Sequence, residues 1–203
     1  MNIRQPIVAV LGHVDSGKTS ILDKIRGTGV QGREAGGITQ HIGASFLPDE
    51  TIQKICGSLY EKLGNTETKI PGLLVIDTPG HEVFTNLRAR GGSAADIAIL
   101  VVDINRGFQP QTNESLKILE SRKVPFVVAL NKVDMISGWQ KSDIPYISQA
   151  IKKQISPVQT TIDEQIYNVV GALSILGYQS EACLLYTSPS PRDQRGSRMP
   201  SSA

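Results

Sequence analysis

Cysteine and long apolar runs are both scarce in this sequence of 203 residues. The two cysteines, Cys56 and Cys183, lie far apart and outside any C-x-x-C pattern, which argues against a disulfide framework or a zinc site and favours a cytoplasmic location. No apolar run approaches the roughly 20 residues that span a membrane, and residues 1–6 lack the apolar segment of a signal peptide. We therefore expect a soluble globular protein with no membrane partner.

An excess of one charge sign is also missing. The formal net charge is +2, and the last 21 residues account for it with three arginines, Arg192, Arg195 and Arg198, against Asp193. Residues 1–182 are neutral overall and lack the basic footprint that nucleic-acid-binding proteins carry. Any role that involves RNA must therefore be argued from motifs.

The N-terminal stretch carries a phosphate-binding pattern. An apolar run ends at Gly12, and Gly17, Lys18 and Thr19 complete the pattern G-x-x-x-x-G-K-T between a predicted strand and a predicted helix. The glycines let backbone N–H groups turn toward an anion, the lysine faces the β and γ phosphates, and the threonine hydroxyl binds Mg²⁺. A glycine-rich turn is the alternative, but the pattern arises by chance in roughly one in a hundred such chains. The residues expected around the nucleotide are His13, Val14, Asp15, Ser16, Gly17, Lys18, Thr19 and Ser20.

Residues 27–42 contain five glycines, too many for a stable helix or a long strand. One interpretation is a solvent loop, and the other is a segment that becomes ordered around a ligand. Thr39 is the candidate in the second case, because its hydroxyl or carbonyl oxygen could reach Mg²⁺ and the γ-phosphate. Spacing alone does not decide between them.

A second polar cluster follows the apolar run 73–76. Asp77 suits a carboxylate that holds Mg²⁺ through water, and the N–H of Gly80 suits a contact to the γ-phosphate. His81 begins a predicted helix. Helix capping by Asp77 and a solvent-facing His81 are the alternatives. The position of this cluster at a second strand end, 59 residues after Lys18, favours a γ-phosphate sensor.

The third motif, Asn-Lys-Val-Asp, follows the apolar run 125–130. The Asp134 carboxylate can accept two parallel hydrogen bonds from guanine, and adenine has no such pair of donors. Asn131 is expected to contact the base N7 and to brace the phosphate loop, while the stem of Lys132 lies along the base plane. A polar loop is the alternative for these four residues alone, but the order of all three motifs favours guanine recognition.

The elements predicted between these motifs indicate a three-layer α/β P-loop NTPase fold, with a mostly parallel sheet and helices on both faces. Predicted strands cover 6–11, 42–47, 73–76, 97–102 and 125–130. Predicted helices cover 17–26, 81–90, 110–123 and 163–176. A further helix of about 13 residues is predicted after the second strand and ends near position 63. Residues 136–160 are predicted to be irregular, with one short helix near 147–155.

Five segments resemble the archaeal and eukaryotic translation initiation factor five B, a relative of bacterial initiation factor two. They are residues 12–19, 34–44, 71–82, 107–112 and 131–134. The resemblance covers roughly residues 4–182 and implies the G domain of a translational GTPase. It also implies a ribosome-dependent enzyme that binds GTP, GDP and Mg²⁺, hydrolyses GTP, and promotes the joining of ribosomal subunits.

The resemblance further assigns residues and partners. It places His81 at the attacking water, Val14 and Ile38 in an apolar gate beside that histidine, and Thr39 on Mg²⁺ as the switch threonine. It links Asp15 to a monovalent cation, K⁺ or Na⁺. The implied partners are the ribosome, through its large subunit, together with initiator tRNA and other initiation factors through domains absent here.

The sequence departs from the family near Cys183. The family's G domain continues to a further strand, a Ser-Ala loop over the guanine O6 and a last helix, so residues 1–182 are expected to form an incomplete GTP-binding domain. Residues 183–203 are rich in Ser, Pro and Arg and are expected to be a disordered, non-native tail. An interaction tail is the alternative.

Two other functions remain open from the sequence. One is a fragment that binds GTP without hydrolysing it. The other is a different translational GTPase, such as an elongation factor, against which segments 34–44 and 46–70 argue.

Overall fold

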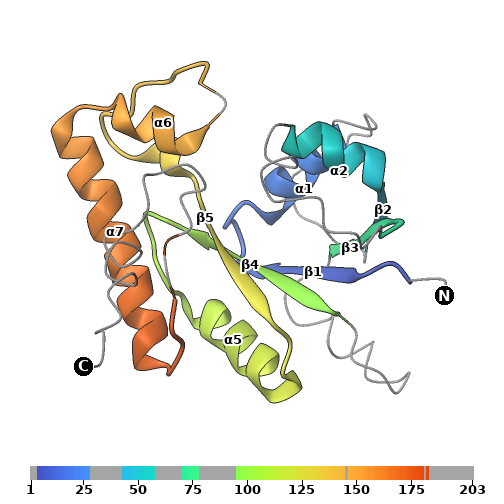
Figure 1. Ribbon diagram of the computed structural model, residues 1–203. Coiled ribbons are helices and arrows are strands. Elements are labelled where there is room, and N and C mark those ends of the chain that lie inside the picture. The colour runs from blue at the N-terminus through green and yellow to red at the C-terminus, as the bar shows by residue number, and fades with distance from the viewer. Residues whose placement is uncertain are drawn as a thin grey trace, which may run out of the picture. The chain divides into compact units, whose positions relative to one another are not determined.

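The computed structural model describes residues 4–27, 43–57, 70–77, 95–144, 146–180 and 182. Contacts divide the chain into two compact units, residues 1–132 and 133–203. The elements of the first unit are β1 Ile7–Gly12, α1 Lys18–Gly27, β2 Gly43–Pro48, α2 Asp49–Cys56, β3 Gly72–Asp77, β4 Ile97–Asp103, α5 Pro110–Arg122 and β5 Phe126–Asn131 (Figure 1). The second unit holds the 3-10 turn η2 Val133–Met135 and the helices α6 Ile147–Lys152 and α7 Ser156–Ile175.

The first unit is built on a five-stranded sheet with the order β2-β3-β1-β4-β5. Strand β1 pairs in parallel with β3 and β4, and β5 pairs in parallel with β4, whereas β2 runs antiparallel to β3 at the edge. The parallel strands are apolar almost throughout, as expected for strands that are covered on both faces. The carboxyl ends of β1, β3, β4 and β5 therefore meet at one edge of the sheet.

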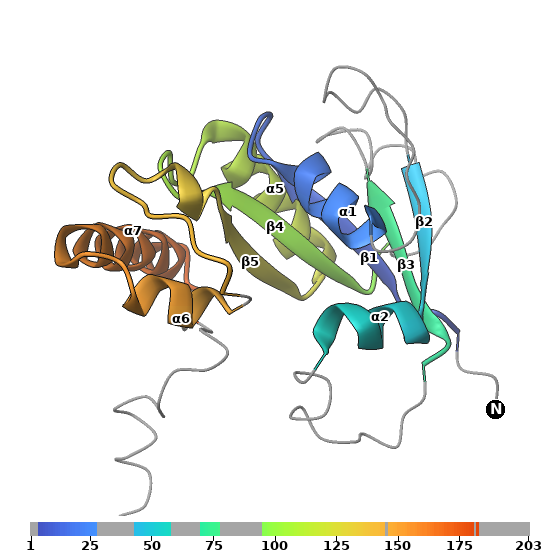
Figure 2. The same cartoon turned by 90° about the horizontal axis from the view of Figure 1, so that it is seen from above.

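Helices cover both faces of this sheet. Helices α1 and α2 lie on one face and α5 lies on the other (Figures 1 and 2). Alternation along β1 explains the two layers, because neighbouring residues of a strand point to opposite faces. Val8 and Val10 pack with Leu22 of α1, and Leu116 and Leu119 are buried on α5. The predicted α/β fold with a mostly parallel sheet is confirmed.

The predicted length of the helix after β2 is wrong. Helix α2 ends at Cys56, several residues before position 63. Gly57 stops it, because its φ of 51° leaves the helical region while its N–H donates to the carbonyl of Gln53 at 2.8 Å. The apolar residues that extended the predicted helix lie in 58–69, outside the described residues.

The predicted boundary of the last helix is also wrong. Helix α7 begins at Ser156 rather than at 163, and Pro157 sits in its first turn. A proline there loses no helical hydrogen bond and has the φ that the helix needs, so this residue starts the helix instead of marking irregular backbone. The short helix α6 at 147–152 agrees with its prediction.

Several predicted features lie outside the described residues. They are most of the glycine-rich segment, the helix at 81–90 and the tail from 183. Within the described ranges, none of the helices has the length and apolar character that crossing a bilayer requires.

Candidate nucleotide-binding site

Strand register brings the predicted motifs toward one edge of the sheet. Gly12 at the end of β1 pairs with Val101 of β4, and Asp103 at the end of β4 pairs with Asn131 at the end of β5. On the other side of β1, Val10 pairs with the backbone of Asp77. Ligands of open α/β sheets bind beyond such carboxyl ends, where the chain switches direction across the sheet.

The loop from β1 to α1 begins with a close backbone approach. A Cβ atom on Gly12 would lie 2.3 Å from the carbonyl oxygen of Val101, and the φ of Gly12 is 148°. The Ser16 N–H then donates to the His13 carbonyl at 3.2 Å, and Asp15 adopts a φ of 62°. Alternating backbone conformations of this kind turn N–H groups toward one side and form an anion-binding concavity.

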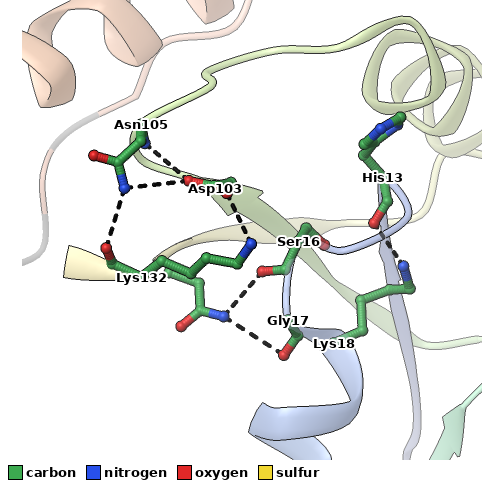
Figure 3. A network of polar contacts seen from close by, with 8 residues as sticks. His13, Ser16, Gly17, Lys18, Asp103, Asn105 and Lys132 are labelled. Atoms are coloured by element: carbon green, nitrogen blue, oxygen red, sulfur yellow. Dashed lines mark hydrogen bonds and ion pairs between the residues drawn. The ribbon is translucent and has the colours of Figure 1, made fainter. Parts of the chain in front are cut away.

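Lys18 closes over this loop. Its Nζ donates to the carbonyl oxygen of Gly12 at 3.0 Å and to that of His13 at 2.7 Å (Figure 3). Lys18 is also the first residue of α1, and Thr19 follows it in the first turn. The positive end of the helix dipole and the ammonium group therefore act at the same place, which suits an anionic ligand.

Asn131 joins the third motif to the phosphate loop. Its Nδ2 donates to the carbonyl oxygen of Ser16 at 2.9 Å and lies 3.5 Å from that of Gly17. Gly17 makes this approach possible, because a Cβ atom there would lie 2.1 Å from Asn131 Nδ2. The structure thus places Asn131 against the loop, and its contact with a base stays a prediction.

We expect Gly17→Ala to lower the free energy of unfolding by about 3 kcal/mol, because the methyl group would displace Asn131 and alanine is strained at a φ of 91°. Gly107→Ala is the matched control, since Gly107 also has positive φ but open space around it. We expect that control to lose about 1 kcal/mol. Urea denaturation measures both values, and equal losses would contradict the proposed crowding.

Three polar residues interlock at the ends of β4 and β5 (Figure 3). Lys132 Nζ lies 2.9 Å from Asp103 Oδ2, and the Asn105 N–H donates to Asp103 Oδ1 at 2.9 Å. Asn105 Nδ2 donates to the Lys132 carbonyl at 3.2 Å. Burial alone would raise the pKa of Asp103, but the hydrogen bonds from Lys132 and Asn105 lower it by more, so its pKa lies below the usual range.

Gln111, near the start of α5, accepts a hydrogen bond from the Val14 N–H at 3.0 Å. Val14 itself is 51% exposed. Beside this contact, His13, Ser16 and residues that follow β4 line a small pocket with room for about one water molecule. Among the described residues, His13 Nδ1 and Ser16 Oγ are buried without a hydrogen-bond partner.

The structure brings only part of the predicted site together. His13 to Ser20 follow one another along the loop and the start of α1 in the first unit. Asn131 contacts this loop at Ser16, and Lys132 contacts Asp103 in the same unit. Asp134 lies in η2 of the second unit with an exposed side chain. Only the backbone of Asp77 is described, and four predicted residues lie outside the described ranges: Ile38, Thr39, Gly80 and His81.

Sequence reasoning missed three residues at this edge of the sheet: Asp103, Asn105 and Gln111. Asp103 had one available signal, because a charged residue directly after a buried strand requires a partner. Gln111 belongs to segment 107–112, but its partner is set by the packing of α5.

Comparison with known protein families matches residues 3–188 to the family described as "Elongation factor Tu GTP binding domain". The "Probable translation initiation factor IF-2" of Methanopyrus kandleri is 58% identical over 180 residues, and that of Thermococcus onnurineus is 56% identical over 179 residues. Each alignment covers 88% of this chain and 30% of the relative. The chain therefore spans under a third of the length of these proteins.

Solved structures agree with these matches. The GDP-bound aIF5B of Aeropyrum pernix superposes with a TM-score of 0.75 and 52% identity, covering 92% of this chain and 31% of that one. A bacterial selenocysteine-specific elongation factor, 24% identical with a TM-score of 0.54, shares the fold. The resemblance to the archaeal initiation factor that the motifs indicated is confirmed, and the chain belongs to the family of elongation factor Tu GTP-binding domains.

Proposed function

We propose that this chain is the G domain of a translation initiation factor that binds GTP and GDP and hydrolyses GTP to GDP and phosphate. The observation that carries the proposal is the contact of Asn131 with Ser16, which joins the loop for phosphates to the motif for guanine. The relative from Aeropyrum pernix, whose fold matches this chain, was solved with GDP.

The phosphate end of the proposed site uses residues whose geometry is described. The ammonium of Lys18 already lies against the carbonyls of the loop, at 2.7 and 3.0 Å, where it can reach a β- or γ-phosphate oxygen. The Thr19 hydroxyl is an oxygen donor of the kind that Mg²⁺ prefers. Mg²⁺ would neutralise charge on the phosphates. Thr39 and Asp77, the latter through water, are the further proposed magnesium residues, and Asp15 is proposed for a monovalent cation.

The base end of the proposed site depends on the third motif. We propose that Asn131 contacts the base N7 and that the stem of Lys132 lies along the base plane. We propose that Asp134 accepts the two parallel hydrogen bonds from guanine. Two of these residues are held by contacts within the first unit. The Asp134 assignment rests on its place in the motif.

Hydrolysis requires few groups, because phosphoryl transfer is mostly positioning and charge stabilisation. We propose that His81 orients the attacking water, that Val14 and Ile38 form the apolar gate beside it, and that Gly80 senses the γ-phosphate. The large ribosomal subunit would stimulate the reaction in the cytoplasm. We propose subunit joining, and contacts with initiator tRNA and other initiation factors, only for full-length initiation factors of the kind that this chain matches over 30% of their length.

Nucleotide titration tests the proposal directly. We expect the 203-residue chain with Mg²⁺ to bind a fluorescent GDP analogue that unlabelled GDP displaces and ADP displaces on the order of 10³-fold more weakly. Lys18→Ala should weaken GDP binding by at least about tenfold, because a charge-assisted contact to phosphate is lost. Equal displacement by ADP and GDP would contradict guanine recognition, and undiminished binding by Lys18→Ala would contradict the phosphate site.

A further inference from the structure

We propose that Asp103 is a positioning residue for guanine nucleotides, which acts by fixing Lys132 at the base end of the site. The inference rests on the proposed function and extends it to a residue that belongs to none of the three motifs. Asp103 lies at the end of β4, next to β5 in the sheet, and is the register partner of Asn131. It is therefore a neighbour of the base-recognition motif in space, although it lies 29 residues before Lys132 in the chain.

The Asp103 carboxylate is built into the structure through both of its oxygens. Its side chain is 10% exposed, so it would be costly to bury without partners. Lys132 Nζ contacts Oδ2 at 2.9 Å, and the Asn105 N–H donates to Oδ1 at 2.9 Å. The hydrogen bond from Asn105 fixes the Asp103 carboxylate, and the carboxylate then fixes the ammonium group of Lys132.

The backbone of Lys132 is held by the same cluster. Lys132 has a φ of 63°, and this left-handed conformation is unfavourable for a residue with a side chain. Such a conformation persists where the surroundings determine it. Asn105 Nδ2 donates to the Lys132 carbonyl at 3.2 Å while lying 3.4 Å from Asp103 Oδ1. Asp103 therefore restrains the side chain of Lys132, and Asn105 restrains its backbone.

The restraint has a consequence for the nucleotide. The aliphatic stem of Lys132 can lie along a base only if its course is defined, and four methylene groups with free rotation do not define one. Anchoring the ammonium on Asp103 fixes the far end of that stem. The preceding residue, Asn131, is itself fixed by its hydrogen bond to the Ser16 carbonyl. The base surface is thus prepared before the nucleotide arrives, which lowers the entropy lost on binding.

The test measures nucleotide affinity of the 203-residue chain. Asp103→Asn keeps the shape of the side chain but loses the charge that holds Lys132. We expect the Kd for GDP to rise about tenfold, because a charge-assisted contact is lost. The Kd for magnesium pyrophosphate, which has no base, should change less than about twofold. Asn105→Ala, at an exposed residue, should weaken GDP binding in the same way but by less.

Two further variants separate positioning from general destabilisation. In a Lys132→Met background, Asp103→Asn should change the Kd for GDP by less than about twofold, because its effect passes through Lys132. Asp96→Asn is the matched control, since Asp96 precedes the opposite end of β4 and pairs with Arg4. It should leave GDP affinity unchanged.

Additive effects of Asp103→Asn and Lys132→Met would overturn the inference, as would an equal loss of pyrophosphate binding. In both cases GDP binding by the unaltered chain would leave the proposed function standing. A wild-type chain that binds no GDP would overturn both.

Discussion

Replacing Asp134 with asparagine is expected to weaken GDP binding on the order of 10³-fold and to make xanthosine diphosphate the preferred ligand. The Asp134 carboxylate accepts from two guanine donors, the ring N1–H and the exocyclic amino group. An asparagine amide offers one acceptor and one donor, so its N–H₂ group would face the amino group of guanine. Xanthine carries a carbonyl oxygen at that position and accepts the new donor.

Competition against a fluorescent diphosphate measures this reversal, with guanosine and xanthosine diphosphates titrated in parallel. Asp143→Asn is the matched control, because Asp143 lies exposed in the same unit and outside the motif. It should leave both affinities unchanged. Equal affinity of wild type and Asp134→Asn for GDP would refute the assigned base contact.

Replacing His81 with alanine is expected to reduce ribosome-stimulated GTP hydrolysis by about 10²- to 10³-fold while the Kd for GTP stays within about twofold. The reason is that the imidazole is proposed to orient water only at the transition state, so its removal leaves the ground-state contacts of the nucleotide intact. Single-turnover hydrolysis with and without ribosomes separates the stimulated rate from the basal one.

A conservative variant sharpens this test. Glutamine can still hydrogen-bond to water, so His81→Gln should retain more stimulated activity than His81→Ala. A loss of GTP affinity that matches the loss of rate would indicate a structural role for His81. Stimulation that persists in His81→Ala would refute the role in positioning water, and a wild-type chain that binds GTP without turnover on ribosomes would favour the non-hydrolysing fragment.

The sheet could be predicted closely from the sequence because its parallel strands are short apolar runs that end at polar residues. The phosphate loop could be predicted because Gly12, Gly17 and Lys18 stand at fixed spacing, and each has a local reason to be there. The ends of the helices were harder to predict. Gly57 ends α2 and Pro157 opens α7, yet apolar spacing alone extended the first helix and shortened the second.

The pairing of distant polar residues could not be predicted. Asp103 meets Lys132 only because β4 and β5 are neighbours in a particular register. Gln111 meets Val14 only because α5 packs with its first turn beside the phosphate loop. A one-residue shift of either element would break these contacts, and nothing near these residues in the chain reports that register.

The contacts of Lys18 affect the rate and the thermodynamics of nucleotide binding. Its ammonium group already contacts two carbonyl oxygens of the loop, so an arriving phosphate meets an ammonium group whose position is already fixed. The rotamer entropy of a lysine, about 2 kcal/mol, is thus lost during folding and not during binding. We therefore expect that ordering of the Lys18 side chain contributes no slow phase to association.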